Sequence, residues 1–494
     1  MTLDGRVIYQ VDPATFSGPG ADAGLDGVRR RLEHVRAVGA DTLWLQPFYV
    51  SPYRDAGYDI VDHHGVSQRF GTMADFDDLV ERCHQLDLRV VVGLVVQHTS
   101  TDHPWFRSAR DDPASPYRDF YVWAAEPHDD EVVKKPVFQG VEDSIWAYDD
   151  HAGRYYRHAF YRHQPDLDVG HPRIREAIAG IVRHWLDHGV DGFRVDAVPH
   201  MVRQAAVTDS RDDGFWFLSE LADAADGAPL LGEVDEGPST YPEYFGNGDR
   251  LTGILDFWTN NLLFLALARS SAEPLVRALR AQPTSPEGCT YLNWLRNHDE
   301  LNLSLLSDSE RDEVMAAFAP DETMRAFGRG IRRRLAPMLG DDVRRVAMAH
   351  AIVQSLPGVP IVRYGEEIGM GDDLSLPGRE AVRTPMEWSK VEEQDLRPGS
   401  LLSRVSQLVH RRRGLGPLRP GHCDALSFGA DAVLGLLHHR ADGPVLMMIN
   451  LSDDQVCLEL EYDVRADLLA DREYEPAGSG VVLGGYGYRW LRVR

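Results

Sequence analysis

Three acidic residues stand at the ends of short apolar segments of the sequence. Asp196 ends the run DGFRVD, Glu233 ends the run LLGE, and Asp299 lies in the run RNHDE. Any one of them could simply cap the helix that follows it. Three acids on strand ends that face a common axis have little structural use, however, because like charges raise one another's pKa values. Two carboxyl groups roughly 5–5.5 Å apart, one ionised and one protonated, perform retaining glycoside chemistry, so we expect an acid/base reaction.

Alternation along a strand places Arg194 on the same side as Asp196. The segments that carry the acids belong to a longer series in which apolar strand segments alternate with amphipathic helical segments, as in a parallel sheet with helical crossovers. Eight β-α units predict an α/β fold, a closed (β/α)₈ TIM barrel. The predicted strands cover residues 6–10, 42–47, 89–96, 190–195, 229–233, 251–257, 291–296 and 359–364, and predicted helices include 28–38, 76–86, 174–188, 215–224 and 343–356.

Two long stretches interrupt this alternation. We expect barrel segments at 1–100 and 171–395, an inserted loop domain at 101–170 after strand three, and a charged helical insert at 307–338 after strand seven. Both insertions should rise over the carboxyl ends of the strands, where active sites of this fold lie. Residues 396–494 read as a helix that leads into a C-terminal antiparallel β domain, because short alternating segments are separated by turn residues.

Composition narrows the class of protein. The 494 residues carry a net charge of −25, which repels phosphate backbones and anionic lipid surfaces, so we expect no nucleic-acid partner. No apolar run is long enough to span a membrane and no export signal is evident. The four cysteines form no C-x-x-C pair, which favours reduced thiols and a cytoplasmic location.

The sequence around the acids resembles the α-amylase superfamily, glycoside hydrolase family 13. The matching stretches are QHTS at 97–100, GFRVDAV at 192–198, GE at 232–233 and RNHDE at 296–300. Within the family the sequence is most similar to the trehalose synthases, on the stretches LQPFY at 45–49, HQPDLD at 163–168, GIRRRLAP at 330–337 and RTPMEW at 383–388.

This resemblance implies a role for each site residue. Asp196 would be the nucleophile, Glu233 the general acid/base, and Asp299 the carboxylate that binds sugar hydroxyls. Arg194 would keep Asp196 ionised, since a nearby cation favours the charged form. His98 and His298 would hydrogen-bond the same glucosyl ring, although each histidine could equally be a core residue with satisfied hydrogen bonds.

The resemblance also implies a clamp at the non-reducing end of the glucose. Asp59 and Arg383 match a pair that closes this end in exo-acting relatives, and Tyr58 would stack on the sugar face. The alternative is an ordinary structural ion pair. With the clamp, the substrates would be short α-glucosides such as maltose or trehalose.

The sequence departs from the family pattern in four places, one of which is Asp168, where the family usually has Asn. The first motif usually opens with an acid and has Asn before its histidine, but Gly93 and Gln97 occupy these positions, so Arg194 lacks an expected partner. Residues 17–26 carry too few acids for a calcium loop, and we expect neither metal nor cofactor. The stretch between Trp388 and the helix near Leu401 is shorter than in trehalose synthases, which favours leakage of glucose from the site.

These observations predict a retaining, trehalose-synthase-like enzyme that interconverts maltose and trehalose by intramolecular glucosyl transfer, with some hydrolysis. The close alternative is an exo-acting α-glucosidase or transglucosylase. An alternative of another class is a non-catalytic carbohydrate-binding member of the family, against which the retention of all three acids argues. A homo-oligomer is left open.

Overall fold

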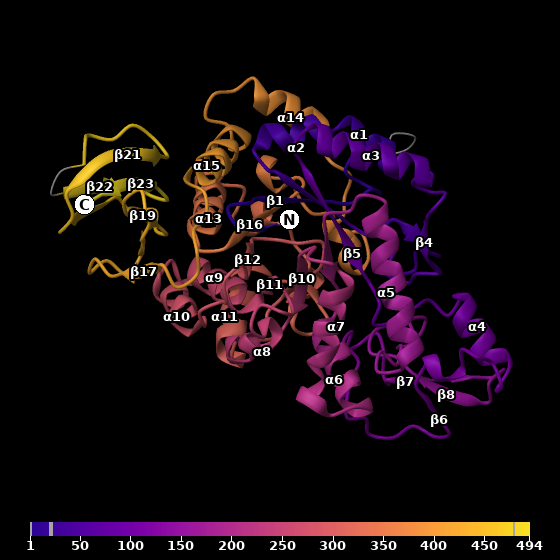
Figure 1. The fold of residues 1–494 in the computed structure, drawn as a ribbon. Helices are drawn as coiled ribbons and strands as arrows, with labels where there is room; N and C mark the ends of the chain where they lie inside the picture. Colours follow the sequence, from indigo (N-terminus) through magenta and orange to yellow (C-terminus); the bar gives the residue numbers. More distant parts are fainter. Residues whose placement is uncertain (1, 19–22, 478–479) are drawn as a thin grey trace.

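Eight parallel strands close into a barrel in the computed structural model, which describes residues 2–18, 23–477 and 480–494 (Figure 1). Each of the eight predicted strands is present, so the predicted barrel is confirmed. In the order in which they hydrogen-bond around the barrel, the strands are β1 (Ile8–Val11), β16 (Val359–Arg363), β12 (Thr290–Trp294), β11 (Gly253–Asp256), β10 (Leu230–Val234), β9 (Gly192–Val195), β5 (Arg89–Leu94) and β2 (Thr42–Leu45).

Side chains that point inward from alternate strand positions fill the barrel. An apolar cluster of Ile8, Trp44, Val91, Leu231, Leu255, Leu292, Trp294 and Ile361 occupies the interior. Further along the same strands toward their carboxyl ends, the inward positions become polar, among them Gln10, Arg194 and Arg363. The barrel interior is therefore apolar toward the amino ends of the strands and lined with hydrogen-bonding groups toward their carboxyl ends, where active sites of this fold lie.

Helices surround the barrel (Figure 1). The predicted helix at 28–38 is two helices, because the chain changes direction at Arg31. The helices around the barrel are α1 (Leu25–Arg30), α2 (Leu32–Val38), α3 (Met73–Gln85), α5 (Pro172–Asp187), α6 (Val198–Thr208), α7 (Trp216–Ala224), α8 (Tyr241–Phe245), α9 (Phe257–Arg269), α10 (Glu273–Ala281) and α13 (Val343–Ser355).

The segment between β5 and β9 folds beside the barrel, at the lower right of Figure 1. It contains α4 (Pro104–Asp111) and an antiparallel sheet in which β8 (Arg154–Arg157) lies between β6 (Trp123–Ala124) and β7 (Trp146–Asp149). Aromatic contacts join its parts, for example Phe106 against Trp123 and Tyr156. A short hairpin of β3 (Tyr49–Val50) and β4 (Asp62–Val66) follows β2.

The segment after β12 is only partly helical, in contrast to the predicted helical insert at 307–338. Helix α11 (Asp308–Phe318) ends just before Pro320, whose ring is disfavoured inside a helix. The chain then forms β14 (Arg325–Ala326) and β15 (Gly330–Ile331) before α12 (Leu335–Met338). Strand β15 lies between β14 and β13 (Leu301–Asn302) and pairs with both. Phe327 and Gly328 make the turn between β14 and β15 with positive φ angles of 54° and 67°.

An antiparallel β domain follows the barrel, at the left of Figure 1, as predicted. Helices α14 (Trp388–Asp395) and α15 (Leu401–Leu415) precede it. Its five-stranded sheet has the order β17 (Cys423–Leu426), β18 (Val433–His438), β19 (Val445–Asn450), β23 (Tyr488–Val493) and β21 (Val464–Ala470), and β20 (Val456–Glu459) pairs with β22 (Gly480–Leu483). Among the described residues, no helix is both long and apolar enough to cross a membrane.

Candidate active site

Arg194 connects two of the three predicted catalytic acids at the carboxyl end of the barrel. One of its terminal nitrogens contacts Asp196 Oδ1, and the other lies 2.7 Å from Glu233 Oε1. The backbone N–H of Ala197 donates to Glu233 Oε2 at 3.0 Å. Ala197 has a left-handed conformation (φ 49°), which turns the chain sharply from β9 into α6 and points this N–H at the neighbouring strand end. One guanidinium and one backbone amide thus hold the two carboxyl groups at the same place.

The electrostatic surroundings of Glu233 favour its protonated form. Burial raises the pKa of Glu233 to about 8, the nearby charges of Asp196 and Asp299 raise it too, and Arg194 opposes the shift. Burial lowers the pKa of Arg194, but Glu233 and Asp196 outweigh that effect, so the guanidinium stays charged. Near neutral pH, Glu233 can therefore donate a proton beside the cation that contacts Asp196.

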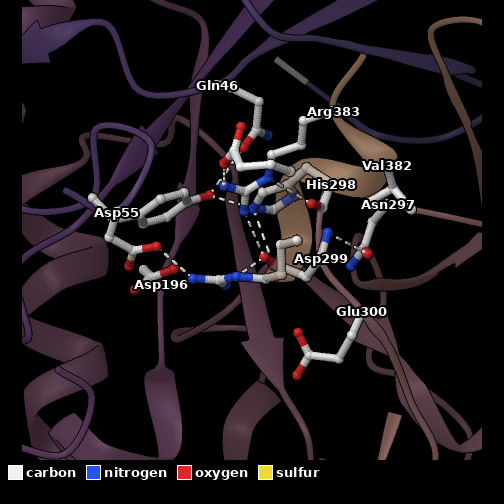
Figure 2. A network of polar contacts seen from close by, with 12 residues as sticks. Gln46, Asp55, Asp196, Asn297, His298, Asp299, Glu300, Val382 and Arg383 are labelled. Carbon is white, nitrogen blue, oxygen red and sulfur yellow. Dashed lines mark hydrogen bonds and ion pairs between the residues drawn. The ribbon is translucent and has the colours of Figure 1, made fainter. Parts of the chain in front are cut away.

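Asp299 lies in the loop after β12 and faces two arginines (Figure 2). Its Oδ1 accepts from Arg379 Nη1 at 2.6 Å and from Arg383 Nη2 at 3.0 Å. Burial acts to raise the pKa of Asp299, whereas the charges of its neighbours, among them the two arginines, bring it below its ordinary value. Asp299 is thus held as an anion, which suits hydrogen bonding to sugar hydroxyl groups.

A chain of hydrogen bonds fixes His298 and Tyr58. The Gln10 amide donates to His298 Nδ1 at 3.0 Å, so the ring proton lies on Nε2, which faces Asp299 Oδ2 at 3.0 Å and Tyr58 Oη at 2.6 Å. Tyr58 Oη donates in turn to Gln46 Oε1 at 3.0 Å. Burial lowers the pKa of His298 well below its ordinary value, so the ring is neutral. The rings of Tyr58 and His298 are stacked, 5.5 Å apart and inclined by 8°.

His98 is also buried. Its Nε2 is 3.1 Å from the carbonyl oxygen of Tyr58, and its Nδ1 is 2.8 Å from Gln97 Oε1. Both Tyr58 and His98 line the same pocket as the three acids.

The structure does not bring Asp59 and Arg383 together as the predicted clamp requires. Asp59 is fully buried, where it accepts from Ser51 Oγ at 2.8 Å and from the backbone N–H groups of Arg54 and Asp55, so it holds its own loop together. Arg383 contacts Asp299, Glu380 and the carbonyl oxygen of His298 instead. Among the described residues no ion pair joins Asp59 to Arg383.

The pair that closes the pocket is Asp55 with Arg379. Arg379 Nη2 contacts Asp55 Oδ1, and the other Asp55 oxygen accepts from Gln164 Nε2 at 2.9 Å. Each partner lies four residues before the one that the sequence had suggested. The signal available in the sequence was weak, because each loop offers two residues of the same charge and spacing along the chain does not reveal which one faces the pocket.

Aromatic rings from the two inserted segments meet beside the clamp, and one of them contacts Arg379. Phe138, from the segment between β5 and β9, lies with its ring 4.7 Å from the guanidinium carbon of Arg379. Its ring centroid is also 4.7 Å from that of Phe327, which is at the turn between β14 and β15. We refer to this Phe138–Phe327 contact as the aromatic bridge. Sequence reasoning expected both segments to wall the pocket but identified neither ring.

The remaining pocket wall is mixed. Phe160 and Phe257 contribute apolar surface, while Asp235, Asn297, Glu300 and Arg329 contribute polar groups beyond the three acids. Within the described part of the chain, no group of three or more His, Cys, Asp and Glu side chains is arranged to hold a metal ion. Residues 19–22, which belong to the stretch where a calcium loop was not expected, lie outside the described residues.

The sequence was also compared with known protein families and proteins, and the results agree with this geometry. Residues 10–301 match the family model described as "Alpha amylase, catalytic domain". The trehalose synthase of Pimelobacter sp. (strain R48) is 33% identical over 99% of this chain and 95% of its own length. Trehalose synthase/amylase TreS of Mycolicibacterium smegmatis is 39% identical over 78% of this chain and 66% of its own length. The oligo-1,6-glucosidase of Parageobacillus thermoglucosidasius is 28% identical over 80% of this chain and 76% of its length.

Solved structures agree on the fold. The α-amylase from H. orenii superposes with a TM-score of 0.81 at 22% identity, with complete coverage of both chains. The trehalulose synthase MutB superposes with a TM-score of 0.78 at 21% identity, with 99% coverage of both chains.

Proposed function

This chain belongs to the alpha-amylase family, and from that premise we propose that it is a retaining, exo-acting enzyme on short α-glucosides, with the interconversion of maltose and trehalose as its main reaction. The observation that carries the proposal is the position of Arg194 between Asp196 and Glu233, in a pocket that the pair of Asp55 and Arg379 closes. The names of the most similar full-length relatives suggest the substrate class.

In the first step, the ionised Asp196 attacks the anomeric carbon, and Glu233 gives its proton to the departing glycosidic oxygen. This forms a bond between Asp196 and the glucosyl unit and releases the second sugar with an intact hydroxyl group. Glu233, now a carboxylate, then takes a proton from the acceptor hydroxyl as that oxygen attacks the same carbon and displaces Asp196. The two inversions together retain the α configuration.

Asp299 and the clamp position the sugar that reacts. Asp299 is held by Arg379 and Arg383 as an anion that accepts hydrogen bonds from sugar hydroxyls, and Asp55 and Gln164 orient Arg379. Because Asp55 and Arg379 come from two separate loops, those after β2 and β16, and meet in an ion pair, a glucan chain cannot pass between them. The pocket therefore suits one terminal glucose.

The acceptor decides whether the enzyme isomerises or hydrolyses. Phe138, which the aromatic bridge supports, lines the pocket and favours retention of released glucose. The short link from Trp388 to α15 favours its loss. This second feature supports the other candidate function, an α-glucosidase or transglucosylase. We place the enzyme in the cytosol, since all four cysteines are unpaired.

Product analysis after separate incubation with maltose and with trehalose tests the proposal. We expect each sugar to yield the other, together with some free glucose. Isotopically labelled external glucose distinguishes the candidates: an isomerase that retains its glucose excludes label from the disaccharide product, whereas a transglucosylase incorporates it. No turnover of either sugar or of an aryl α-glucoside would leave only the non-catalytic alternative.

A further inference from the structure

Arg157, at the end of β8 in the inserted segment, is buried between that segment and the barrel helix α6. Its side chain is 3% exposed, and each of the three guanidinium nitrogens has an acceptor. Nε donates to Asp166 Oδ2 at 2.9 Å, Nη1 to Asp130 Oδ1 at 3.2 Å, and Nη2 to Gln204 Oε1 at 2.5 Å. The three acceptors lie in separate parts of the chain, and this one side chain connects them.

The contact with Asp166 leads to His98 in the pocket. Asp166 is fully buried and forms a β-bridge with His98. Burial raises the pKa of Asp166, but the charge of Arg157 and the hydrogen bond from the Ala159 N–H bring it below its ordinary value. The Gln97 side chain acts on Asp166 in the same direction, and its Oε1 lies 2.8 Å from His98 Nδ1. Arg157 thus stabilises a buried anion next to the residues that orient His98.

The contact with Gln204 leads to the nucleophile. Gln204 lies in α6, which begins two residues after Asp196 and whose first turn places His200 at the pocket. The amide nitrogen of Gln204 donates to Asp168 Oδ1 at 2.8 Å, so the amide oxygen faces Arg157. Asp168, one of the departures from the family pattern, therefore belongs to this network.

The contact with Asp130 leads to the loop that carries Phe138. Asp130 Oδ1 also accepts from the backbone N–H groups of Val132 and Val133, at 2.8 and 2.9 Å, and both of these side chains are buried. The loop then reaches the pocket, where Phe138 forms part of the lining. We refer to the segment from Asp130 to Phe138 as the wall loop. The carboxylate that holds its first residues is itself held by Arg157.

We propose that Arg157 is a positioning residue for the reaction, which acts on the substrate only through His98 and the wall loop. It is not among the residues that line the pocket. The catalytic part of this inference rests on the proposed function. Loss of the Asp130 contact should release the wall loop alone, whereas loss of Arg157 should also leave Asp166 without its cation and disturb His98.

Proteolysis measures the state of the wall loop without reference to activity. The sequence contains three lysines, Lys134, Lys135 and Lys390, and a proline follows Lys135 and blocks cleavage there. A lysine-specific endoproteinase therefore cuts the wall loop only after Lys134, which is exposed. In the full-length protein, Asp130→Asn should speed this cut by about tenfold relative to the cut after Lys390, since cleavage follows the population of the open loop. Asp129→Asn, which removes the same charge from the exposed neighbour, should leave the rate unchanged.

Catalysis is measured separately on the same variants. With maltose, Asp130→Asn should raise the share of free glucose by about threefold, while kcat/KM for an aryl α-glucoside should change by less than about twofold. Arg157→Gln should in addition raise KM for the aryl glucoside by about tenfold, more than it lowers kcat, because the pocket around His98 is disturbed. Loss of stability alone would reduce the amount of folded enzyme and leave both the product share and KM unchanged. If Arg157→Gln does not fold, Asp130→Asn decides, because it keeps the contacts of Arg157 with Asp166 and Gln204.

These outcomes separate two kinds of failure. Faster cleavage after Lys134 in an Asp130→Asn variant of a protein that turns over no α-glucoside contradicts the proposed function and leaves the positioning of the wall loop by Arg157 standing. Equal cleavage of Asp130→Asn and Asp129→Asn would overturn the inference. So would an active Asp130→Asn enzyme with the same share of free glucose as the unmodified enzyme.

Discussion

Asp55, in the loop after β2, and Arg379, in the loop after β16, form an ion pair, although 324 residues separate them in the chain. Arg379 contacts Asp299 at the same time, so this one side chain links the loop after β2 to the loop after β12. Asp59, four residues beyond Asp55, is fully buried within its own loop. The two aspartates therefore have separable roles, which mutation can distinguish.

Asp55→Asn should lower kcat/KM for maltose by about 10²-fold or more, because Arg379 loses a charged partner and no longer fixes Asp299. Asp59→Asn is the matched control. It should lower the free energy of unfolding by about 1–3 kcal/mol through its loop hydrogen bonds, with a much smaller effect on kcat/KM in the folded fraction. Steady-state kinetics and thermal unfolding measure both effects. The reverse pattern would show that Asp59, and not Asp55, is the clamp residue.

Substrate length gives a second measure of the clamp. For the unmodified enzyme, kcat/KM should change little from maltose to longer maltooligosaccharides, and amylose should be a poor substrate, because one terminal glucose fills the closed end. Rapid cleavage inside amylose would contradict this assignment of Asp55 and Arg379.

Asp196→Ala should reduce turnover by about 10⁴-fold or more while the protein remains folded, since the nucleophile is lost. Circular dichroism checks the fold. The unmodified enzyme should release the α-anomer first, which NMR can follow before mutarotation. Release of the β-anomer first, or substantial activity of the variant, would exclude Asp196 as the nucleophile.

The pKa of Glu233, raised to about 8, predicts the alkaline limb of the pH profile. A general acid must be protonated, so kcat/KM should fall as the pH rises through about 8. Glu233→Gln should remove this limb and reduce glycosylation by maltose far more than by an aryl α-glucoside, whose leaving group needs little protonation. Equal losses for the two substrates in that step would show that Glu233 is not the proton donor.

The raised pKa of Glu233 also makes a prediction for stability. The carboxyl group keeps its proton in the folded state between its ordinary pKa and about 8, while the unfolded chain releases it. Stability should therefore decrease across this pH window, and Glu233→Gln, which cannot ionise, should lose less over the same range. Chemical denaturation at pH 5 and at pH 8.5 measures the difference between the two proteins. An identical pH dependence would show that the Glu233 pKa is not raised.

Phe327→Ala should increase the share of free glucose among the products of maltose, because it opens the aromatic bridge over the pocket. Labelled external glucose should enter the disaccharide product more readily than in the unmodified enzyme. Phe318→Ala, which alters the core beside α11 away from the pocket, controls for general loosening of this segment. If the unmodified enzyme already releases glucose and Phe327→Ala does not change the share of free glucose, the short link after Trp388 is the cause of the release.

The sequence was sufficient to predict the barrel strands and the position of the three acids, because both depend on local patterns. Alternation along β9 puts Arg194 and Asp196 on one face, and the carboxyl ends of parallel strands necessarily meet at one rim. The clamp depends on the path of two loops instead. The hydrogen bond from Ser51 to Asp59 turns Asp59 inward and leaves Asp55 for the pocket, and nothing in the spacing of the two acids encodes that choice.

The segment at 307–338 shows a similar limit. Its charges and helical spacing predict one helical insert, but Phe327 and Gly328 turn the chain with positive φ angles. A phenylalanine is rarely found in that conformation, so its place in the aromatic bridge could be identified only from the structure.

The aromatic bridge has a consequence for evolution and for engineering. Phe138 and Phe327 belong to different insertions, yet their rings contact each other, and Phe138 also lies against Arg379 from the loop after β16. The two insertions are thus not interchangeable parts. In a chimera that takes residues 101–170 from a relative, the residue at position 138 would come from a protein with a different residue at position 327. The residue at 327 would have to be exchanged at the same time for the product specificity of the relative to be transferred.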